Sequence, residues 1–352
     1  MVPLSAFKFA HILHPITVDD ACDKLKILRA LPGTWVEKIT PRIPPVKISP
    51  ISGLSPRGRI EGCFIYLGLT AQQLAGWPER FCLEKILKCG RLAERTGAQL
   101  VGLGGMTAVI GGRGIEVARR LQSAVTTGRT FCIATALQSA CRLIERRGRI
   151  KEDLKCTVVD ASSSLGGTCS QLLIRYGFTN LTLVADHKHR LDNLVWKLLY
   201  DYGISVKITS NIPQALEKAD LIVLADDIPG KEVDGDSGPF LKQESIICNL
   251  RQRELSSREV LSGDNGITLI ESGVVQVPLQ INFNKKFGFT VPRTIPAEVA
   301  ETMILSMDGK KHSFSLGDEI RIEKVDEMMR MAQKHSFELV GYLSQNKAIY
   351  FS

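Results

Sequence analysis

Residues 155–186 read KCTVVDASSSLGGTCSQLLIRYGFTNLTLVAD, and this stretch decides the fold class of the chain. A strand-like apolar run at 155–159 leads into a turn that contains serine and glycine, and an amphipathic stretch then leads to a second apolar strand at 181–185. Asp186 stands at the tip of that second strand. This order is the βαβ unit that binds dinucleotides, in which an acidic residue about 20 residues after the turn holds a ribose.

The turn departs from the usual glycine pattern of such units. Asp160 and Ser163 stand at the first two glycine positions, and only Gly166 is retained. A carboxylate beside a pyrophosphate is repulsive, whereas the N–H groups of a helix start bind anions without needing glycine. Ser163 or Ser164 would serve equally well as the N-cap of the following helix. The sequence leaves cofactor binding open, and the candidate contacts in the turn are Ser162, Ser163, Leu165 and Gly166.

Strand-like and helix-like segments alternate along the chain. We predict strands at 7–13, 60–67, 98–103, 155–159, 181–185, 204–208, 221–225, 245–249 and 267–270. We predict helices at 18–31, 78–96, 129–147, 166–176, 188–201, 213–219, 254–261, 297–307 and 320–335. The proline-rich stretch 40–56 is predicted to be a loop or extended segment. The alternation predicts an α/β fold with a doubly wound, largely parallel, Rossmann-like sheet.

A length of 352 residues suggests two domains of ordinary size. We predict a Rossmann-like dinucleotide-binding domain over residues 131–295, which includes a linking helix. A second α/β domain, for substrate and catalysis, is predicted to combine residues 1–130 with the C-terminal helices in about 296–352.

The composition is that of a soluble globular protein, with 44% hydrophobic and 23% charged residues. We find neither an apolar run of membrane-spanning length nor a signal peptide pattern, so we expect a cytoplasmic location without a membrane span. Nine cysteines are scattered through apolar runs without a CxxC pair. They predict buried, reduced thiols and no metal site.

The charge of the chain is unevenly divided. Residues 1–150 hold 22 Lys and Arg against 10 Asp and Glu, a net charge of +12, and the remainder carries −4. The basic half is either a site that attracts an acidic macromolecule or anionic substrate, or a solvated surface without a special partner. Nucleic acid binding is not predicted, because aromatic residues do not interleave with the basic ones. Oligomerisation is left open.

Several short stretches match a known family. They are FAHIL at 9–13, EGCF at 61–64, GLGGMT at 102–107, TTGRT at 126–130, the turn at 160–166 and IPAEVAETM at 295–303. On these stretches the chain resembles the long-chain acyl-[acyl carrier protein] reductases and their relatives, the predicted amino acid dehydrogenases. The resemblance covers about residues 8–345.

The resemblance implies a reductase that converts acyl thioesters to aldehydes with NADPH and a nucleophilic cysteine. Glu298 occupies the position of that cysteine, and no cysteine follows Cys248. A carboxylate is a poor substitute for a thiolate in acyl exchange. Cys63 also matches a family cysteine, but its apolar strand favours a role in the core. The usual covalent mechanism is therefore predicted to be absent.

The resemblance also implies positions for the cofactor and substrate. Asp186 replaces a family arginine, which favours NAD over NADP, although the following residues 187–190 add positive charge. Thr126, Thr127 and Gly128 are predicted to turn hydroxyls and N–H groups toward an anion or carbonyl, and Glu61 to orient the substrate. Glu298, Thr127 and Glu61 are the catalytic candidates.

Two functions of different classes stay open. The first is an oxidoreductase that transfers hydride between NAD or NADP and a carbonyl-type substrate, small or carrier-linked, without a covalent thioester. The second is a catalytically silent relative that binds acyl chains, an acidic carrier protein or another partner, and has lost its cofactor. We prefer the oxidoreductase, because the βαβ spacing, Gly166 and Asp186 are retained.

Overall fold

A computed structural model describes residues 6–15, 35, 38–56, 58–226, 241–251, 266–284 and 287–351. Two compact units divide the chain. Unit 1 contains the described residues within 1–131, 275–317 and 328–338, and unit 2 contains those within 132–274, 318–327 and 339–352. The helices predicted at 18–31 and 254–261 lie outside the described residues.

Unit 1 is built on a mixed six-stranded sheet of order β13-β2-β3-β1-β4-β5. Its parallel strands are β1 (Phe7–Leu13), β3 (Gly58–Tyr66), β4 (Leu100–Leu103) and β5 (Ala124–Thr126). At the edge, β2 (Val46–Ser55) and β13 (Ile281–Phe283) run antiparallel to their neighbours. In the centre, His11 of β1 lies level with Phe64 of β3 and Gly102 of β4.

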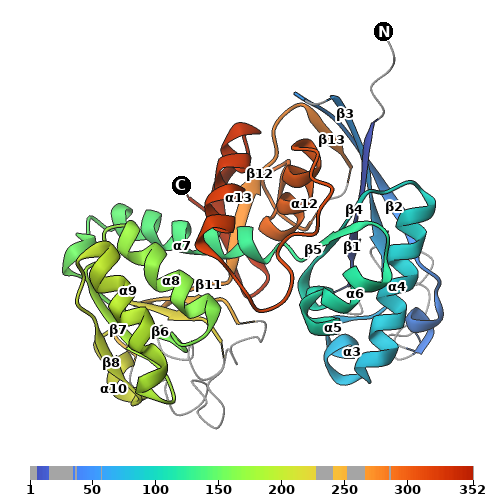
Figure 1. Ribbon diagram of the computed structural model, residues 1–352. Helices are drawn as coiled ribbons and strands as arrows, with labels where there is room; N and C mark the ends of the chain where they lie inside the picture. The colour runs from blue at the N-terminus through green and yellow to red at the C-terminus, as the bar shows by residue number, and fades with distance from the viewer. Residues whose placement is uncertain are drawn as a thin grey trace. The chain divides into compact units, whose positions relative to one another are not determined.

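Helices cover both faces of the unit 1 sheet (Figure 1). Ala10 and Ile12 of β1 join a core cluster with residues of α4 (Glu79–Arg95). On the opposite face, His11 contacts Thr302 of α12 (Ala297–Met307). The alternation of side chains along a strand thus assigns α4 and α12 to opposite faces. The remaining helical segments are α3 (Ala71–Gly76), η3 (Gly105–Ala108), α5 (Ile110–Arg113) and α6 (Ile115–Arg120).

For the proline-rich stretch 40–56 the sequence predicts a loop or extended segment, and most of it is extended, as the strand β2. Three of its prolines lie before the strand and Pro56 follows it, so only Pro50 is inside. Pro50 pairs with Cys63 of β3, next to a register shift between Lys47 and Ser49. A proline is tolerated in a strand at such irregular positions, because the missing N–H breaks little of the ladder. Proline content alone therefore does not separate a loop from an extended strand.

Unit 2 is built on a parallel six-stranded sheet of order β11-β10-β9-β6-β7-β8. The strands are β6 (Lys155–Val159), β7 (Asn180–Val184), β8 (Lys207–Thr209), β9 (Leu221–Leu224), β10 (Ile246–Asn249) and β11 (Thr268–Ile270). The helices are α7 (Arg129–Arg146), which begins in unit 1, α8 (Ser164–Arg175), α9 (Asp192–Tyr202) and α10 (Ile212–Leu216). This strand order is that of the Rossmann fold, so the predicted fold class is confirmed.

The unit limits differ from the predicted domain limits at the C-terminal side. Residues 275–295 fall in unit 1, where β13 pairs with β2. Residues 339–352 fall in unit 2, where β15 (Glu338–Ser344) forms a hairpin with β16 (Lys347–Tyr350). The last helix, α13 (Ile322–Lys334), and the short strands β12 (Ser272–Gln276) and β14 (Thr294–Pro296) complete the elements. In the part of the chain that the structure describes, no helix combines the length and apolar character needed to cross a membrane.

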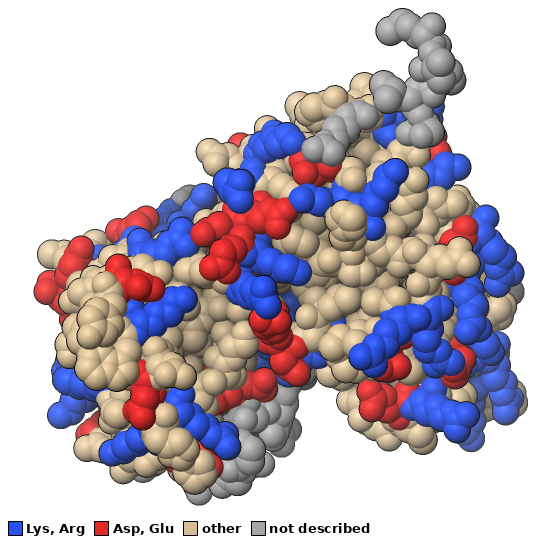
Figure 2. Space-filling view, viewed as in Figure 1, with Lys and Arg blue, Asp and Glu red and all other residues tan. Residues whose placement is uncertain are grey.

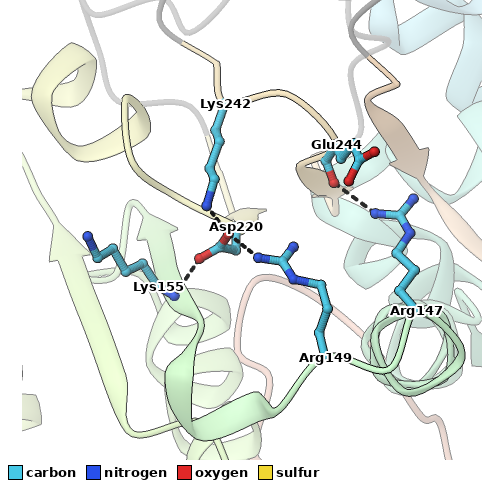
Figure 3. A network of polar contacts seen from close by, with 6 residues as sticks. All are labelled: Arg147, Arg149, Lys155, Asp220, Lys242 and Glu244. Carbon is cyan, nitrogen blue, oxygen red and sulfur yellow. Dashed lines mark hydrogen bonds and ion pairs between the residues drawn. The ribbon is translucent and has the colours of Figure 1, made fainter.

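An ion-pair network lies where the strands of the unit 2 sheet begin (Figure 3). Asp220, which immediately precedes β9, accepts hydrogen bonds from Arg149 and Lys242, both at 2.5 Å, and from the Lys155 backbone N–H at 2.9 Å. Its side chain is only 5% exposed. Ligands of α/β sheets bind at the opposite, carboxyl ends of the strands, so this network is structural.

Asp220→Asn is expected to lower the free energy of unfolding by about 2 kcal/mol at neutral pH, because two cations lose their buried partner. Burial alone would raise the pKa of Asp220, but Lys242, the Lys155 N–H and Arg149 together hold it below its ordinary value. The stabilisation is therefore complete above the unfolded pKa of about 4 and is lost as the pH falls through the lower, folded-state pKa. Urea unfolding monitored at Trp196 of α9 measures the effect.

Asp326→Asn is the matched control for Asp220. Asp326 pairs with Arg175 at 3.0 Å, but both side chains are about two-fifths exposed. Such a surface pair contributes roughly 0–1 kcal/mol. An equal loss in the two variants at neutral pH would contradict the structural role of Asp220.

Candidate functional site

The strand order of unit 2 reverses between β6 and β9, which lie side by side with Val159 level with Leu224. In doubly wound sheets such a reversal marks a crevice outside the carboxyl ends of the two strands. Ligands of doubly wound sheets bind at this switch point. Asp160, directly after β6, and Asp226, shortly after β9, therefore border the candidate cofactor site.

The turn after β6 keeps the backbone conformation of a glycine turn although its first glycine is replaced. Asp160 has a φ of +53°, in the left-handed region. Aspartate is one of the few residues other than glycine that adopt this region repeatedly. The Ser162 hydroxyl donates to Asp160 Oδ1 and the Ser163 hydroxyl to Asp160 O, both at 2.8 Å. Asp160 thus adds a negative charge to the turn while it has a backbone conformation that glycine readily adopts.

Ser163 and Gly166 position the start of α8. Ser163 is the N-cap, and its Oγ accepts a hydrogen bond from Gly166 N at 3.0 Å. A Cβ added to Gly166 would stand 2.2 Å from Asp160 O and 2.6 Å from Ala161 Cα. Such close approach of helix and strand is what the last glycine of a dinucleotide-binding turn allows. Leu165 is buried, so only its backbone is available to a ligand.

Asp160 carries the main electrostatic obstacle to an anion at this turn. Burial raises the pKa of Asp160, and the nearby Asp226 carboxylate raises it further. The hydroxyls of Ser162 and Ser163 and the Arg190 guanidinium act in the opposite direction. Arg190 belongs to the short helix η5 (Lys188–Leu191), which follows β7. The Arg190 guanidinium, in the connection after β7, thus partly offsets the negative charge of Asp160, in the connection after β6.

Asp186 lies at the same edge of the sheet, two residues beyond the end of β7. Its side chain is 39% exposed and lies 3.3 Å from His187 Nε2. The His187 ring stacks on His189, with ring centroids 5.5 Å apart. Since β6 and β7 are neighbouring parallel strands, the structure places Asp186 beside the 160–166 turn, where a ribose-binding acid stands.

In unit 1, two glycines make room for Glu298 in the first turn of α12. Gly128 has a φ of +75°, and a Cβ added there would stand 2.3 Å from Glu298 Cβ. A Cβ on Gly104, which follows β4, would stand 3.3 Å from Glu298 Cγ and 2.7 Å from His11 Nε2. The structure therefore brings Glu298, Gly104 and Gly128 together at the carboxyl ends of β4 and β5, with His11 next to them.

Glu301, one turn later in α12, was not predicted as a functional residue and organises this region. Its carboxylate is fully buried and accepts from the Thr126 hydroxyl, from the Ser315 hydroxyl at 2.7 Å, and from the N–H groups of Phe131, at 2.9 Å, and Gly128. Burial raises the pKa of Glu301, and these donors oppose the rise. The sequence signal was an acidic residue in the middle of a largely apolar helix that also carries Glu298 in its first turn.

The hydroxyls of Thr126 and Thr127 are directed into unit 1 and not toward a ligand as predicted. Thr126 donates to Glu301, and Thr127 donates to the carbonyl of Ser315. The two residues are 0% and 3% exposed. Buried hydroxyls take the nearest acceptor, because an unpaired one costs free energy. They hold the turn that carries Gly128 in place.

Glu61 lies away from Glu298, which corrects its predicted role in orienting a substrate. It is level with Lys8 of β1, three residues before Phe64, so about 10 Å of strand separates it from the level of His11. Its carboxylate pairs with Arg59 at 3.2 Å, and the two side chains are 37% and 64% exposed. Glu61 is a surface carboxylate on the first half of its strand.

The eight cysteines within the described residues are thiols, and all but Cys132 are buried. Burial raises the pKa of Cys63 and raises those of Cys89 and Cys141 to about 12. Thiols protonated in this way are poor nucleophiles at neutral pH. Among the described residues, no group of His, Cys, Asp and Glu is arranged to hold a metal ion.

The basic half of the sequence has a mixed surface. Figure 2 shows Lys and Arg side chains over the part of unit 1 that carries α4 and α6, with Asp and Glu among them. Arg120 pairs with Glu84 at 2.6 Å and Arg119 with Glu116 at 2.7 Å. These pairs favour the interpretation as a solvated surface over that of a uniform docking site for an acidic partner.

The sequence of the chain is similar to those of two curated proteins. The chain is 26% identical over 314 residues to a long-chain acyl-[acyl-carrier-protein] reductase from Synechococcus elongatus, covering 84% of this chain and 87% of that protein. The predicted resemblance is confirmed. The chain is also 24% identical over 316 residues to the aminotransferase PigE from a Serratia species, and the match covers 89% of this chain.

The chain spans only 36% of the length of PigE. Among solved structures it is similar to L-tryptophan dehydrogenase from Nostoc punctiforme, with 13% identity, a TM-score of 0.39, and coverage of 94% of this chain and 82% of that one. No protein-family model matches the sequence.

Proposed function

We propose that the chain is a nicotinamide-dependent oxidoreductase that acts on a carbonyl-type substrate without a covalent cysteine thioester. One observation carries the proposal. In the turn at the switch point Asp160 is in the left-handed region and Gly166 is in a contact that leaves no room for a Cβ, which are two features that suit a dinucleotide-binding turn. The sequence similarity to an acyl carrier protein reductase supports the same reaction class.

The residues around the switch point would hold the cofactor in distinct ways. The start of α8, capped by Ser163, would present its N–H groups and the positive end of its dipole to a pyrophosphate. Asp186 would accept hydrogen bonds from ribose hydroxyls, so we propose NAD over NADP. The nicotinamide, when bound, supplies or accepts a hydride.

Glu298 is the proposed acid of unit 1. In the reducing direction the carbonyl carbon receives the hydride, and the carbonyl oxygen receives a proton from the Glu298 carboxyl group. The carboxylate that remains is reprotonated from water, so atoms and charge balance without a bond between protein and substrate. Aldehydes, ketones and imines suit this chemistry, whether free or linked to a carrier, because none requires a thiolate.

Asp160→Asn tests the cofactor site, because asparagine tolerates the left-handed conformation and removes the charge. We expect NADH to bind the native chain, and to bind the variant roughly 10- to 100-fold more tightly. The reason is that the repulsion between a carboxylate and a nearby phosphate weakens binding by roughly 1–3 kcal/mol after screening. Because its pKa is raised, Asp160 gains a proton as the pH falls, so the native affinity should rise toward acid pH while the variant changes less. Calorimetric titration with NAD, NADH, NADP and NADPH measures both effects.

Gly166→Ala is the blocking control in the same titration, because its Cβ would collide with the backbone of residues 160 and 161. It should abolish binding in the native chain and in the Asp160→Asn background. Undiminished binding by the Gly166→Ala variant would place the cofactor elsewhere and contradict the proposal.

The alternative is a catalytically silent relative that binds an acyl chain or an acidic carrier protein. The paired carboxylates of Asp160 and Asp226 at the switch point favour it. It predicts no response of the native chain to any of the four dinucleotides at any pH. Binding that is restored in the Asp160→Gly, Ser163→Gly double variant would identify a lost cofactor site and refute the oxidoreductase.

A further inference from the structure

Helix α9 of unit 2 leaves three large apolar side chains in solvent. Trp196 is 55% exposed, Leu199 is 42% exposed and Tyr200 is 79% exposed. The rings of Trp196 and Tyr200 are stacked, with centroids 5.6 Å apart and an angle of 23° between their planes. Because residues four apart are neighbours on a helix, the two aromatic side chains form one ridge along α9.

Two opposite charges lie beside this aromatic ridge. Lys197 and Asp201 are both exposed, and each directly follows one of the two aromatic residues, so they form the neighbouring ridge of α9. Neither side chain has an ion-pair partner among the described residues, although the two are one turn apart. A lysine that precedes an acid by four residues is the less favourable order for a pair within a helix. Both charges are therefore available to another molecule.

The order of these four residues makes the surface complementary to itself. When a second copy of α9 lies antiparallel to the first, Trp196 of one copy meets Tyr200 of the other, and Lys197 of one meets Asp201 of the other. A parallel copy would instead place lysine opposite lysine and acid opposite acid. A twofold axis generates the antiparallel arrangement, in which both copies use the same surface. The ridges of residues four apart can then interdigitate, as they do in the commonest class of helix packing.

The exposed apolar area of α9 suits the centre of such a contact. Figure 2 shows a surface over α9 without charged side chains at its centre and with both signs of charge around it. The exposed parts of Trp196, Leu199 and Tyr200 amount to on the order of 300–400 Å². A stable contact covers about 800 Å² of each partner, with an apolar centre rich in aromatic residues and a polar rim. We propose that α9 is the contact between two copies of this chain, related by a twofold axis.

Sedimentation velocity of the full chain over a range of concentrations tests the proposal. We expect a particle of twice the chain mass of 38.8 kDa. Tyr200→Glu places a charge in the centre of the contact and should raise the dissociation constant roughly 100-fold or more, since central aromatic residues dominate the binding free energy of interfaces. Leu279→Glu is the control, because Leu279 is 81% exposed but belongs to unit 1, and it should leave the dimer intact.

Charge reversal tests the antiparallel arrangement. Lys197→Asp alone brings two acids together at each end of the contact, and Asp201→Lys alone brings two lysines together, so each variant should sediment as a monomer. An equimolar mixture of the two variants should form mixed dimers, because every acid then meets a lysine. The double variant Lys197→Asp, Asp201→Lys should dimerise on its own. These substitutions are at exposed positions, so the far-UV circular dichroism of each variant should match that of the native chain.

Three outcomes would overturn the proposal. A native chain that sediments as a monomer at every concentration would leave the α9 surface to a partner of a different kind. A dimer that withstands Tyr200→Glu would have its contact elsewhere on the molecule. Single charge variants that each retain the native dimer would exclude the antiparallel pairing of Lys197 with Asp201.

Discussion

Glu301→Ala is expected to lower the free energy of unfolding by about 3–5 kcal/mol, because it removes one partner from a buried charged network. Two hydroxyls and two N–H groups donate to this carboxylate, from Thr126, Ser315, Phe131 and Gly128. All four donors would lose a buried acceptor at once, and the side chain would leave a cavity. The turn from 126 to 131 is then expected to loosen.

The unfolding of unit 1 can be read separately in a Trp196→Phe background. Trp196 lies on α9 of unit 2 and is more than half exposed, so its loss should be mild. Trp35 is also more than half exposed and is replaced by Phe as well, so that Trp77 alone reports on unit 1. Urea unfolding followed by Trp77 fluorescence then gives the change in free energy for the Glu301 variants.

Two further variants calibrate the Glu301 result. Glu61→Ala removes an exposed ion pair of the same unit and should cost at most about 1 kcal/mol. Glu301→Gln retains one acceptor oxygen, so its loss of unfolding free energy should fall between those of Glu301→Ala and Glu61→Ala. Because burial raises the pKa of Glu301, the stability that its protonated form provides is lost as the pH rises through that pKa. The difference in free energy of unfolding between the native chain and Glu301→Gln should therefore become smaller at higher pH. If the alanine variants at 301 and 61 cost the same, the organising role of Glu301 is wrong.

The parallel strands of unit 2 were predictable because both of their faces are buried. Such strands read as continuous apolar runs, as in Leu221–Leu224, where all four residues are buried. The strand β2 was predicted only as a loop or extended segment because its sequence contains proline and glycine, which mark loops unless a partner strand is known. The three-residue strands β5, β13 and β14 carry too little pattern to be recognised, and their pairing comes from the tertiary fold.

Sequence similarity found the neighbourhood of the unit 1 site better than the roles of its residues. The residues Gly128 and Glu298 were predicted to share a site, and the structure brings them into contact. Which residues lie level with Glu61 depends on the register between its strand and the neighbouring strand, and the sequence around Glu61 does not reveal that register. The roles of Thr126, Thr127 and Glu301 depend on one another, since the hydroxyls turn inward only because a buried carboxylate is there to accept them.

Gly128→Ala is expected to cost about 3 kcal/mol or more, through two effects that act together. A left-handed φ of +75° costs an alanine roughly 1–2 kcal/mol. The added Cβ would also stand 2.3 Å from Glu298 Cβ and 2.4 Å from Glu298 Cα, an overlap that the start of α12 relieves only by moving. The same urea titration at Trp77 measures the loss.

Gly288→Ala separates the two effects, because Gly288 belongs to the same unit, has a φ of +76° and has open space where a Cβ would stand. It should show the conformational cost alone, roughly 1–2 kcal/mol. Equal costs for the two alanines would mean that Glu298 does not depend on the glycine behind it. Because the overlap falls on the Glu298 backbone as well as its side chain, reorientation of the carboxyl group alone cannot relieve it.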